Sequence, residues 1–119
     1  MKWFILKKIN IVKENRDFDR IIKNNSPFRY KSFLIYIERG QDNYKFGISV
    51  SKKLCNAVGR NKIKRQIRSI IEKYNYNKDF NCIIIARRSI MDYNFQELNE
   101  QLLYCFQKLN IIKGEEHEK

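Results

Sequence analysis

Residues 46–71 read FGISVSKKLCNAVGRNKIKRQIRSII, and this stretch carries the clearest structural signal in the 119-residue chain. Its apolar residues first alternate, at Phe46, Ile48 and Val50, and this pattern predicts a strand over residues 44–50. From residue 56 to about residue 75 they recur every three or four positions, which predicts an amphipathic helix. The apolar positions of that helix are Ile63, Ile67, Ile70, Ile71 and Tyr74.

Shorter patterns upstream predict another helix and another strand. Asn15 can cap a helix in which Phe18, Ile21 and Ile22 share one face. In residues 32–38 the apolar residues Phe33, Ile35 and Ile37 alternate with others, which predicts a strand. Because Leu34 and Tyr36 on its other face are also apolar or aromatic, the pattern leaves open which face lies in the core. Residues 39–43 contain a glycine and predict a hairpin loop that joins this strand to residues 44–50.

Downstream, residues 81–87 form an apolar run that predicts a strand in the middle of the sheet or beside it. The last helix is expected to begin near Asn94, with Glu97 three residues on as a capping box. The patterns therefore predict a mixed α/β chain with its elements in the order α-β-β-α-β-α. We expect one domain over residues 1–113 and a polar, disordered tail over residues 114–119.

The charge is strongly positive, with 25 Lys and Arg against 13 Asp and Glu and a formal net charge of +12. An AT-rich genome also favours Lys, Asn and Ile codons, so the position of the charges matters more than their sum. Residues 43–71 include no acidic residue, which scattered codon bias does not explain, and an anionic partner is therefore expected. The basic residues in that span are Lys45, Lys52, Lys53, Arg60, Lys62, Lys64, Arg65 and Arg68.

Several classes of site and of location are disfavoured. The three cysteines form no C-x-x-C pair and the only histidine, His117, lies in the tail, so the sequence supports neither a disulfide framework nor a zinc site. The basic region has no paired acids for a metal, so we expect no catalytic and no metal-binding residues. The early apolar cluster at residues 3–6 is too short for a signal peptide or a membrane span, and we expect a cytoplasmic protein.

The cations of the central helix fall on one flank of its apolar stripe. At about 100° per residue, Arg60, Lys64 and Arg68 lie in the adjoining sector with Asn61 and Arg65, whereas Lys62 falls on the far side. A solvated charged flank is the ordinary interpretation of such a row. However, the row has no acidic partner four residues away, and positive charge near a helix N-terminus opposes the macrodipole by about 0.3–1 kcal/mol. We therefore interpret the flank as a binding surface for phosphates.

At these residues the sequence resembles the bacterial ribonuclease P protein subunit. The resemblance is carried by FGISVSKK at residues 46–53 and NAVGRNKIKRQIR at residues 56–68, which contains the run Arg60-Asn61-x-x-Lys64-Arg65-x-x-Arg68. It extends in family order to Asp17-Phe18, to FLIY at residues 33–36 and to IIIAR at residues 83–87. Such an ordered set covers most of the chain and is far more specific than a basic patch alone.

The resemblance implies an α/β two-layer sandwich, in which a small mixed sheet packs with helices and a left-handed β-α-β crossover occurs, as in certain ribosomal-protein-like domains and against the usual right-handed preference. The single domain over residues 1–113 would then be an RNA-binding domain. It implies a subunit that binds ribonuclease P RNA and precursor tRNA and promotes endonucleolytic removal of the 5′ leader. The catalytic groups and the Mg²⁺ ions would then belong to the RNA, and no cofactor is expected on the chain alone. No membrane contact and no protein partner is implied.

Matching positions imply two groups of site residues. The candidate RNA-binding set is Lys52, Lys53, Arg60, Asn61, Lys62, Lys64, Arg65 and Arg68. The candidate leader cleft is Phe18, Ile22 and Tyr36, where aromatic rings could stack on unpaired bases at about 1–3 kcal/mol each. Phe18 is equally expected as a core residue. Ile22 replaces an aromatic residue common in the family, Cys55 replaces a loop glycine, and residues 8–11 lack the customary arginine.

Two other functions fit the same charge. A ribosomal protein or general RNA chaperone would need the same basic surface, and specific stimulation of ribonuclease P RNA would distinguish the two. A sequence-specific DNA-binding protein would need a helix with base-reading side chains and usually a dimer. The cations of the central helix suit phosphates better than bases, so we regard DNA binding as the weakest of the three.

Overall fold

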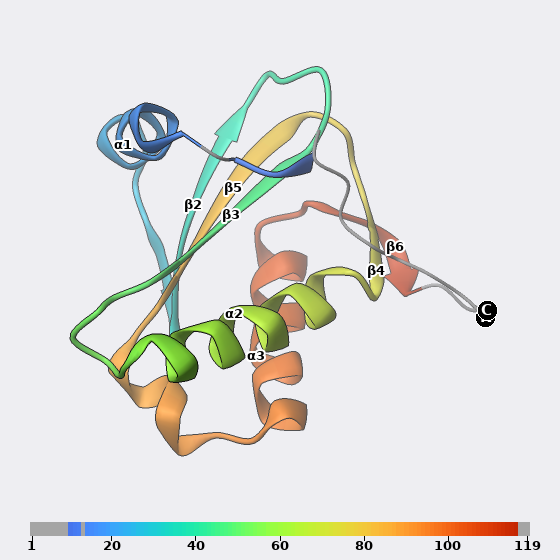
Figure 1. The fold of residues 1–119 in the computed structure, drawn as a ribbon. Helices are drawn as coiled ribbons and strands as arrows, with labels where there is room; N and C mark the ends of the chain where they lie inside the picture. Colours follow the sequence, from blue (N-terminus) through green and yellow to red (C-terminus); the bar gives the residue numbers. More distant parts are fainter. Residues whose placement is uncertain (1–9, 13, 117–119) are drawn as a thin grey trace.

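The computed structural model of the chain describes residues 10–12 and 14–116, and its helices pack around a small sheet (Figure 1). The elements in chain order are α1 (Asn15–Asn24), β1 (Phe28–Tyr30), β2 (Phe33–Arg39), β3 (Lys45–Val50), α2 (Ala57–Ile71), β4 (Tyr74–Tyr76), β5 (Phe80–Ala86), η2 (Arg88–Asp92), α3 (Phe95–Lys108) and β6 (Ile112–Glu116). The long elements follow the predicted order, and the mixed α/β class is confirmed.

The strand β5 lies between β2 and β3, in a four-stranded sheet of order β1-β2-β5-β3. It pairs antiparallel with β2 and parallel with β3. The predicted hairpin at residues 39–43 is therefore wrong, because β5 separates the two strands that it was expected to join. An apolar run that is buried on both faces belongs in the sheet interior, where both of its edges are hydrogen-bonded. The loop after β2 crosses the start of β5, where Gln41 N–H donates to the Asp79 carbonyl at 3.2 Å.

The connection from β3 to β5 passes through α2 and β4 and joins two parallel neighbours. Parallel strands require such a crossover, because a tight turn joins only antiparallel ones. The left-handed sense of this connection stays a prediction from the family resemblance. The pairing places the C-terminal ends of the two strands side by side, with Val50 opposite Ala86.

Helices cover both faces of the sheet, with α1 on one face and α2 and α3 on the other (Figure 1). Successive residues of β5 point to opposite faces, so this strand supplies side chains to both layers. Ile83 is buried with Ile21 of α1, whereas Ile84 is buried in the larger core with residues such as Ile67 and Phe106. Each fully buried side chain of this size contributes about 1.5–3 kcal/mol. The fold therefore depends on β5 from both sides.

Side-chain caps set the starts of the two long helices. The Asn56 side chain accepts a hydrogen bond from Gly59 N–H at 2.9 Å, and α2 begins one residue later. Asn94 and Glu97 form the predicted capping box at the start of α3. Such caps satisfy backbone groups that the first turn leaves unpaired, and each typically contributes about 1 kcal/mol. For α1 the prediction is wrong by one residue, because Asn15 is already helical and Glu14 precedes it without a side-chain cap bond.

The region after α2 differs most from the sequence prediction. The helix ends at Ile71 and not near residue 75, because Tyr74 and Tyr76 form a short strand and both are buried. The Tyr76 hydroxyl donates to the Ile71 carbonyl at 2.7 Å, which satisfies a carbonyl at the helix end. Strand β6 pairs with β4 and extends to Glu116. The strand includes residues 114–116 of the segment that the sequence predicts as a polar tail, and residues 117–119 lie outside the described residues. The disorder of the tail stays a prediction.

A polar network centred on Arg20 ties α1 to the sheet. The Arg20 guanidinium donates to the two carboxylate oxygens of Glu38 at 2.9 and 3.2 Å, and to Asp17 at 2.7 Å. The Asn81 amide on β5 also donates to Glu38, at 2.8 Å. The hydrogen bond from Arg20 is the main cause that lowers the pKa of Glu38, although partial burial of the carboxylate opposes it. The network therefore joins α1, β2 and β5 at one end of the sheet.

Replacing Glu38 by Gln should lower the free energy of unfolding at neutral pH and reduce its dependence on pH. The carboxylate has a lower pKa in the folded chain than in the unfolded chain, so its stabilisation is present above the ordinary Glu pKa. It is lost as the pH falls through the folded pKa. Urea unfolding at neutral pH and at about pH 3 measures the difference between E38Q and the wild type, which should shrink in acid.

The control is Glu14→Gln, since Glu14 pairs with Arg16 at 3.5 Å with both side chains mostly exposed. Exposed pairs contribute little, so this variant should match the wild type at both pH values. A gap between E38Q and the wild type that stayed constant with pH would contradict the assigned role of Glu38.

Candidate nucleic-acid interface

The apolar stripe of α2 fixes the direction of its cations. Its buried residues, Ile63, Ile67, Ile70 and Ile71, pack into the larger core. Because these positions face inward, Lys64 and Arg68 emerge along one flank of the helix. Arg60 is half-buried, and its guanidinium donates to the Cys55 carbonyl at 3.1 Å, which ties the first turn to the loop before it. The predicted row of cations therefore lies along one side of α2, and the helix is held in place by its first turn and by its buried apolar residues.

A pocket of about 190 Å³ lies between α1, β3 and α2. Phe18 reaches it from α1, and Lys64 and Arg68 reach it from α2. Its remaining described walls are Ile11, Val12, Phe46 and Ile48. The structure thus brings one residue of the predicted leader cleft next to two of the predicted RNA-binding cations. An apolar surface with an ammonium and a guanidinium group beside it suits an unpaired nucleotide, whose base can pack while its phosphate is neutralised.

The three predicted leader residues share one layer of the fold. Phe18, Ile22 and Tyr36 are half-buried and pack against the cluster of Val12, Ile21 and Ile83 beneath α1. Phe18 packs on this core and also lines the pocket, so its side chain belongs to the core and still borders an open cavity. Its contact with the leader stays a prediction. Ile22 and Tyr36 lie in the same layer but are not among the described walls of the pocket.

Gly47 on β3 makes this position of Phe18 possible. A Cβ atom at residue 47 would lie 2.6 Å from Cζ of Phe18 and 2.8 Å from Cδ1 of Ile83. Real Cβ atoms do not approach other atoms so closely, so any side chain at Gly47 would displace the ring or the isoleucine. The absence of a side chain at this position therefore lets the Phe18 ring lie directly on the sheet.

The members of the predicted RNA-binding set differ in their exposure. Arg60 and Lys64 are half-buried, and the other six are exposed, namely Lys52, Lys53, Asn61, Lys62, Arg65 and Arg68. The ion pairs defined among the described residues join Arg16, Arg20 and Arg39 to carboxylates, and none of these pairs includes a member of the set. Lys62 lies outside the pocket, as its position on the far side of the helix predicts.

The cysteines differ in their surroundings. Cys82 and Cys105 are buried, and burial raises the thiol pKa of Cys82 well above its ordinary value and that of Cys105 to about 12. Cys55 is half-buried in the loop before α2. Over residues 10–12 and 14–116, no three His, Cys, Asp or Glu side chains gather in a group that could hold a metal ion.

No helix in the described part of the chain combines the length and the apolar composition that a bilayer crossing requires.

Sequence reasoning missed one wall of the pocket. Ile11 pairs with Phe46 in a parallel bridge, and Val12 N–H donates to the Phe46 carbonyl at 2.9 Å. These interactions place the segment before α1 along the free edge of β3. The only available signal was the apolar pair Ile11-Val12 among polar neighbours, and such a pair does not reveal which strand it will join.

Comparisons with known proteins agree with this geometry. The model of the family described as Ribonuclease P matches residues 6–110. The ribonuclease P protein component of Streptococcus pyogenes serotype M12 (strain MGAS2096) is 38% identical over 117 residues, covering 96% of this chain and 98% of that protein. A solved mutant of the Staphylococcus aureus RNase P protein with defective mRNA degradation activity is 34% identical, with a TM-score of 0.79, and the match covers 87% of this chain and 91% of that one. The Thermotoga maritima RNase P protein is 26% identical, with a TM-score of 0.72 and coverage of 87% and 97%.

Replacing Gly47 by Ala should destabilise the chain by about 1–3 kcal/mol, because the new methyl group would overlap the Phe18 ring. In a Phe18→Ala background the same change should cost less, since that ring is absent. A double-mutant cycle measured by urea unfolding gives the coupling, which should be at least about 0.5 kcal/mol. Equal costs in the two backgrounds would show that the close approach of Gly47 and Phe18 does not constrain the fold.

Proposed function

The chain belongs to the ribonuclease P protein family, and from this premise we propose that it binds the 5′ leader of precursor tRNA beside the catalytic RNA. As a protein component of ribonuclease P, its partner is the ribonuclease P RNA. The observation that carries the proposal is the pocket in which Phe18 meets Lys64 and Arg68. It offers apolar packing and phosphate neutralisation at one place, as a single-stranded leader requires.

The exposed face of α2 and the loop before it would contact the ribonuclease P RNA. Lys52, Lys53 and the outward cations of the helix are accessible and stand on a fixed backbone. Contacts with phosphates would set the register of the protein on its RNA without reading base sequence. Each contact would also release counterions, so binding should weaken steeply as salt rises.

Leader cleavage would be performed by the RNA and not by this chain. Mg²⁺ held by the RNA would supply the activated water and stabilise the leaving oxygen. The residues of the chain would bind and orient: Phe18 would hold an unpaired leader nucleotide, and Lys64 and Arg68 would reduce repulsion between the leader and the RNA backbone. The resemblance supports this division of labour, as does the accessibility of the cations. We place this activity in the cytoplasm, where precursor tRNA is processed.

The alternative of a ribosomal protein or general RNA chaperone is not favoured. Its basic surface would look similar, but the family match spans residues 6–110 and the structural neighbours are RNase P proteins. A general chaperone would also have no need for a pocket that joins an aromatic ring to two cations.

Reconstitution tests the proposed function directly. A transcript of a bacterial ribonuclease P RNA is mixed with precursor tRNA at low Mg²⁺, with and without the purified chain. The chain should restore leader removal, because its cations offset repulsion that Mg²⁺ would otherwise screen. The chain without the RNA should release no leader. Cleavage by the chain alone, or no stimulation of the RNA, would contradict the proposal.

Replacing Tyr36 by Ala should weaken binding of precursor tRNA by about 5- to 150-fold if its ring stacks on a leader base, since one such stack contributes about 1–3 kcal/mol. Binding of mature tRNA should not change, and fluorescence anisotropy of the two labelled RNAs gives the comparison. Tyr36→Phe is the matched control, because it keeps the ring and should keep the affinity. An equal loss for both RNAs in the alanine variant would point to a damaged fold and not to a leader contact.

A further inference from the structure

Cations that the proposed function does not use lie at the sheet end where β3 and β5 finish. Val50 and Ala86 are paired there, so the basic loop after β3 and Arg87 leave the sheet from neighbouring strands. The Arg87 guanidinium donates to the Lys31 carbonyl at 3.0 Å, which brings the β1–β2 turn to the same end. Lys31, Arg87 and Arg88 are all exposed. Three basic side chains thus gather beyond the loop that carries Lys52 and Lys53.

The backbone beneath these cations is fixed through Ser32, which is fully buried. Its carbonyl accepts a hydrogen bond from Arg87 N–H at 2.8 Å, and its N–H donates to the Gln101 side chain at 3.1 Å. Its hydroxyl lies 3.1 Å from the hydroxyl of Ser89. These bonds join the β1–β2 turn, η2 and α3. A ligand bound here would therefore order little additional backbone.

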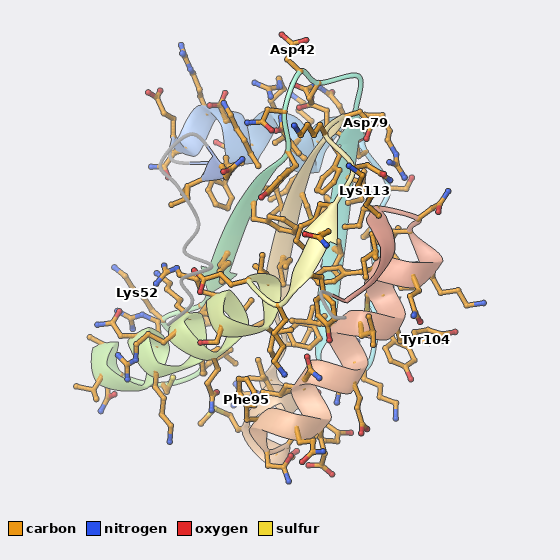
Figure 2. The ribbon with its side chains drawn as sticks, turned by 90° about the vertical axis from the view of Figure 1, so that its right-hand side faces the viewer. Asp42, Lys52, Asp79, Phe95, Tyr104 and Lys113 are labelled. Carbon is orange, nitrogen blue, oxygen red and sulfur yellow. The ribbon has the colours of Figure 1, made fainter. Side chains whose placement is uncertain are left out.

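Two stacked tyrosines continue the same surface onto α3. The ring centroids of Tyr30 and Tyr104 are 4.3 Å apart. The Lys31 ammonium lies 5.6 Å from the Tyr30 ring centroid, and the Lys108 ammonium lies 5.6 Å from that of Tyr104. Figure 2 shows Tyr104 projecting outward from α3. Each ring thus has the other ring against one side and an ammonium group over it, so neither offers a free face to a base.

The backbone at Lys31 gives a second reason to look for a role of its side chain. Its φ is 46°, in the left-handed region that Gly and Asn adopt more readily than Lys. A turn that served the fold alone would be easier to form with one of those residues. Its occupation by a lysine favours a function for the positive charge.

These cations are not neutralised by the ion pairs of the described residues, which involve Arg16, Arg20 and Arg39. On α3, Glu100 lies one turn before Tyr104 and limits the positive surface on that side. Like charges held close together on a fixed backbone repel each other unless an anion lies among them. Under the proposed function, the polyanion that this protein meets is RNA.

We propose that this sheet-end surface, defined as Lys31, Arg87 and Arg88 with the Tyr30–Tyr104 stack beside them, is a second binding surface for the sugar-phosphate backbone of double-helical RNA. It rests on the proposed function and extends it, because it continues from Lys52 and Lys53 away from the pocket at Phe18. Lysine, arginine and tyrosine hydroxyl groups are the usual partners of phosphate oxygens. A helical segment fits better than an unpaired strand, since the tyrosine faces are already occupied.

The test compares the salt dependence of binding to a ribonuclease P RNA transcript over a series of KCl concentrations. Lys31→Asn combined with Arg88→Gln removes two cations, and Asn suits the positive φ at residue 31. The slope of log affinity against log salt should fall by about 0.9 for each duplex phosphate that the variant no longer neutralises. The control is Lys78→Gln with Lys113→Gln, which removes the same charge at the opposite end of β5, where both lysines line one pocket, and its slope should match the wild type.

An unchanged slope in the Lys31/Arg88 variant would overturn the inference, as would an equal fall in the Lys78/Lys113 control. Arg88→Gln alone guards against a folding effect at the turn, and its slope should fall by about half as much as that of the double variant. The double variant should also keep the wild-type ratio of affinities for precursor and mature tRNA, and a changed ratio would overturn the separation from the leader pocket. A variant in which Arg60, Lys64 and Arg68 are replaced together by Ala tests the proposed function independently. An unchanged slope in that variant would contradict the RNA role of α2, whatever the result for the sheet-end surface.

Discussion

The whole molecule depends on the burial of β5 between β2 and β3. This strand hydrogen-bonds along both of its edges and is covered on both of its faces, with Ile83 beneath α1 and Ile84 beneath α2 and α3. Disruption of any one of these interactions would weaken both layers, since the same backbone holds them in register. The two helices that carry the candidate interface lie on opposite faces of the sheet. Their relative position is set by the strands between them.

The pocket combines a candidate binding surface with residues that stabilise the fold. Phe18 is half in the core beneath α1 and half in the pocket, and it lies where Gly47 has no side chain. The Arg20 network then holds α1 against β2 and β5 on the same face. Binding residues that are also packed residues have few accessible rotamers, so they lose little conformational entropy when a ligand arrives.

Sequence patterns predicted the elements whose periodicity is long enough to define a face. The apolar stripe of α2 located Lys64 and Arg68 on one flank, and the capping box located the start of α3. The strand that pairs with β2 could not be predicted in the same way. That strand is β5, which begins some 40 residues after the end of β2 and lies where β3 was expected. The strand β4 has three residues, too few to establish a period, and its first residue, Tyr74, continued the helical spacing of α2. The contribution of Ile11 to the pocket was missed for a related reason, since Ile11 pairs with the edge of β3, which is distant in the sequence. Local patterns thus predicted the direction of side chains, whereas the pairing between distant segments required the structure.

The central position of β5 also has a consequence for the order of events during synthesis. The ribosome completes α1, β2, β3 and α2 before it reaches Phe80, so the cations of α2 and the residues of the candidate leader cleft are translated while the middle strand is still missing. Until then β2 and β3 have no shared partner, and the wall formed by α1 cannot be aligned with the cations of α2. The pocket that joins Phe18 to Lys64 and Arg68 is therefore complete only after β5 has emerged and the sheet has closed.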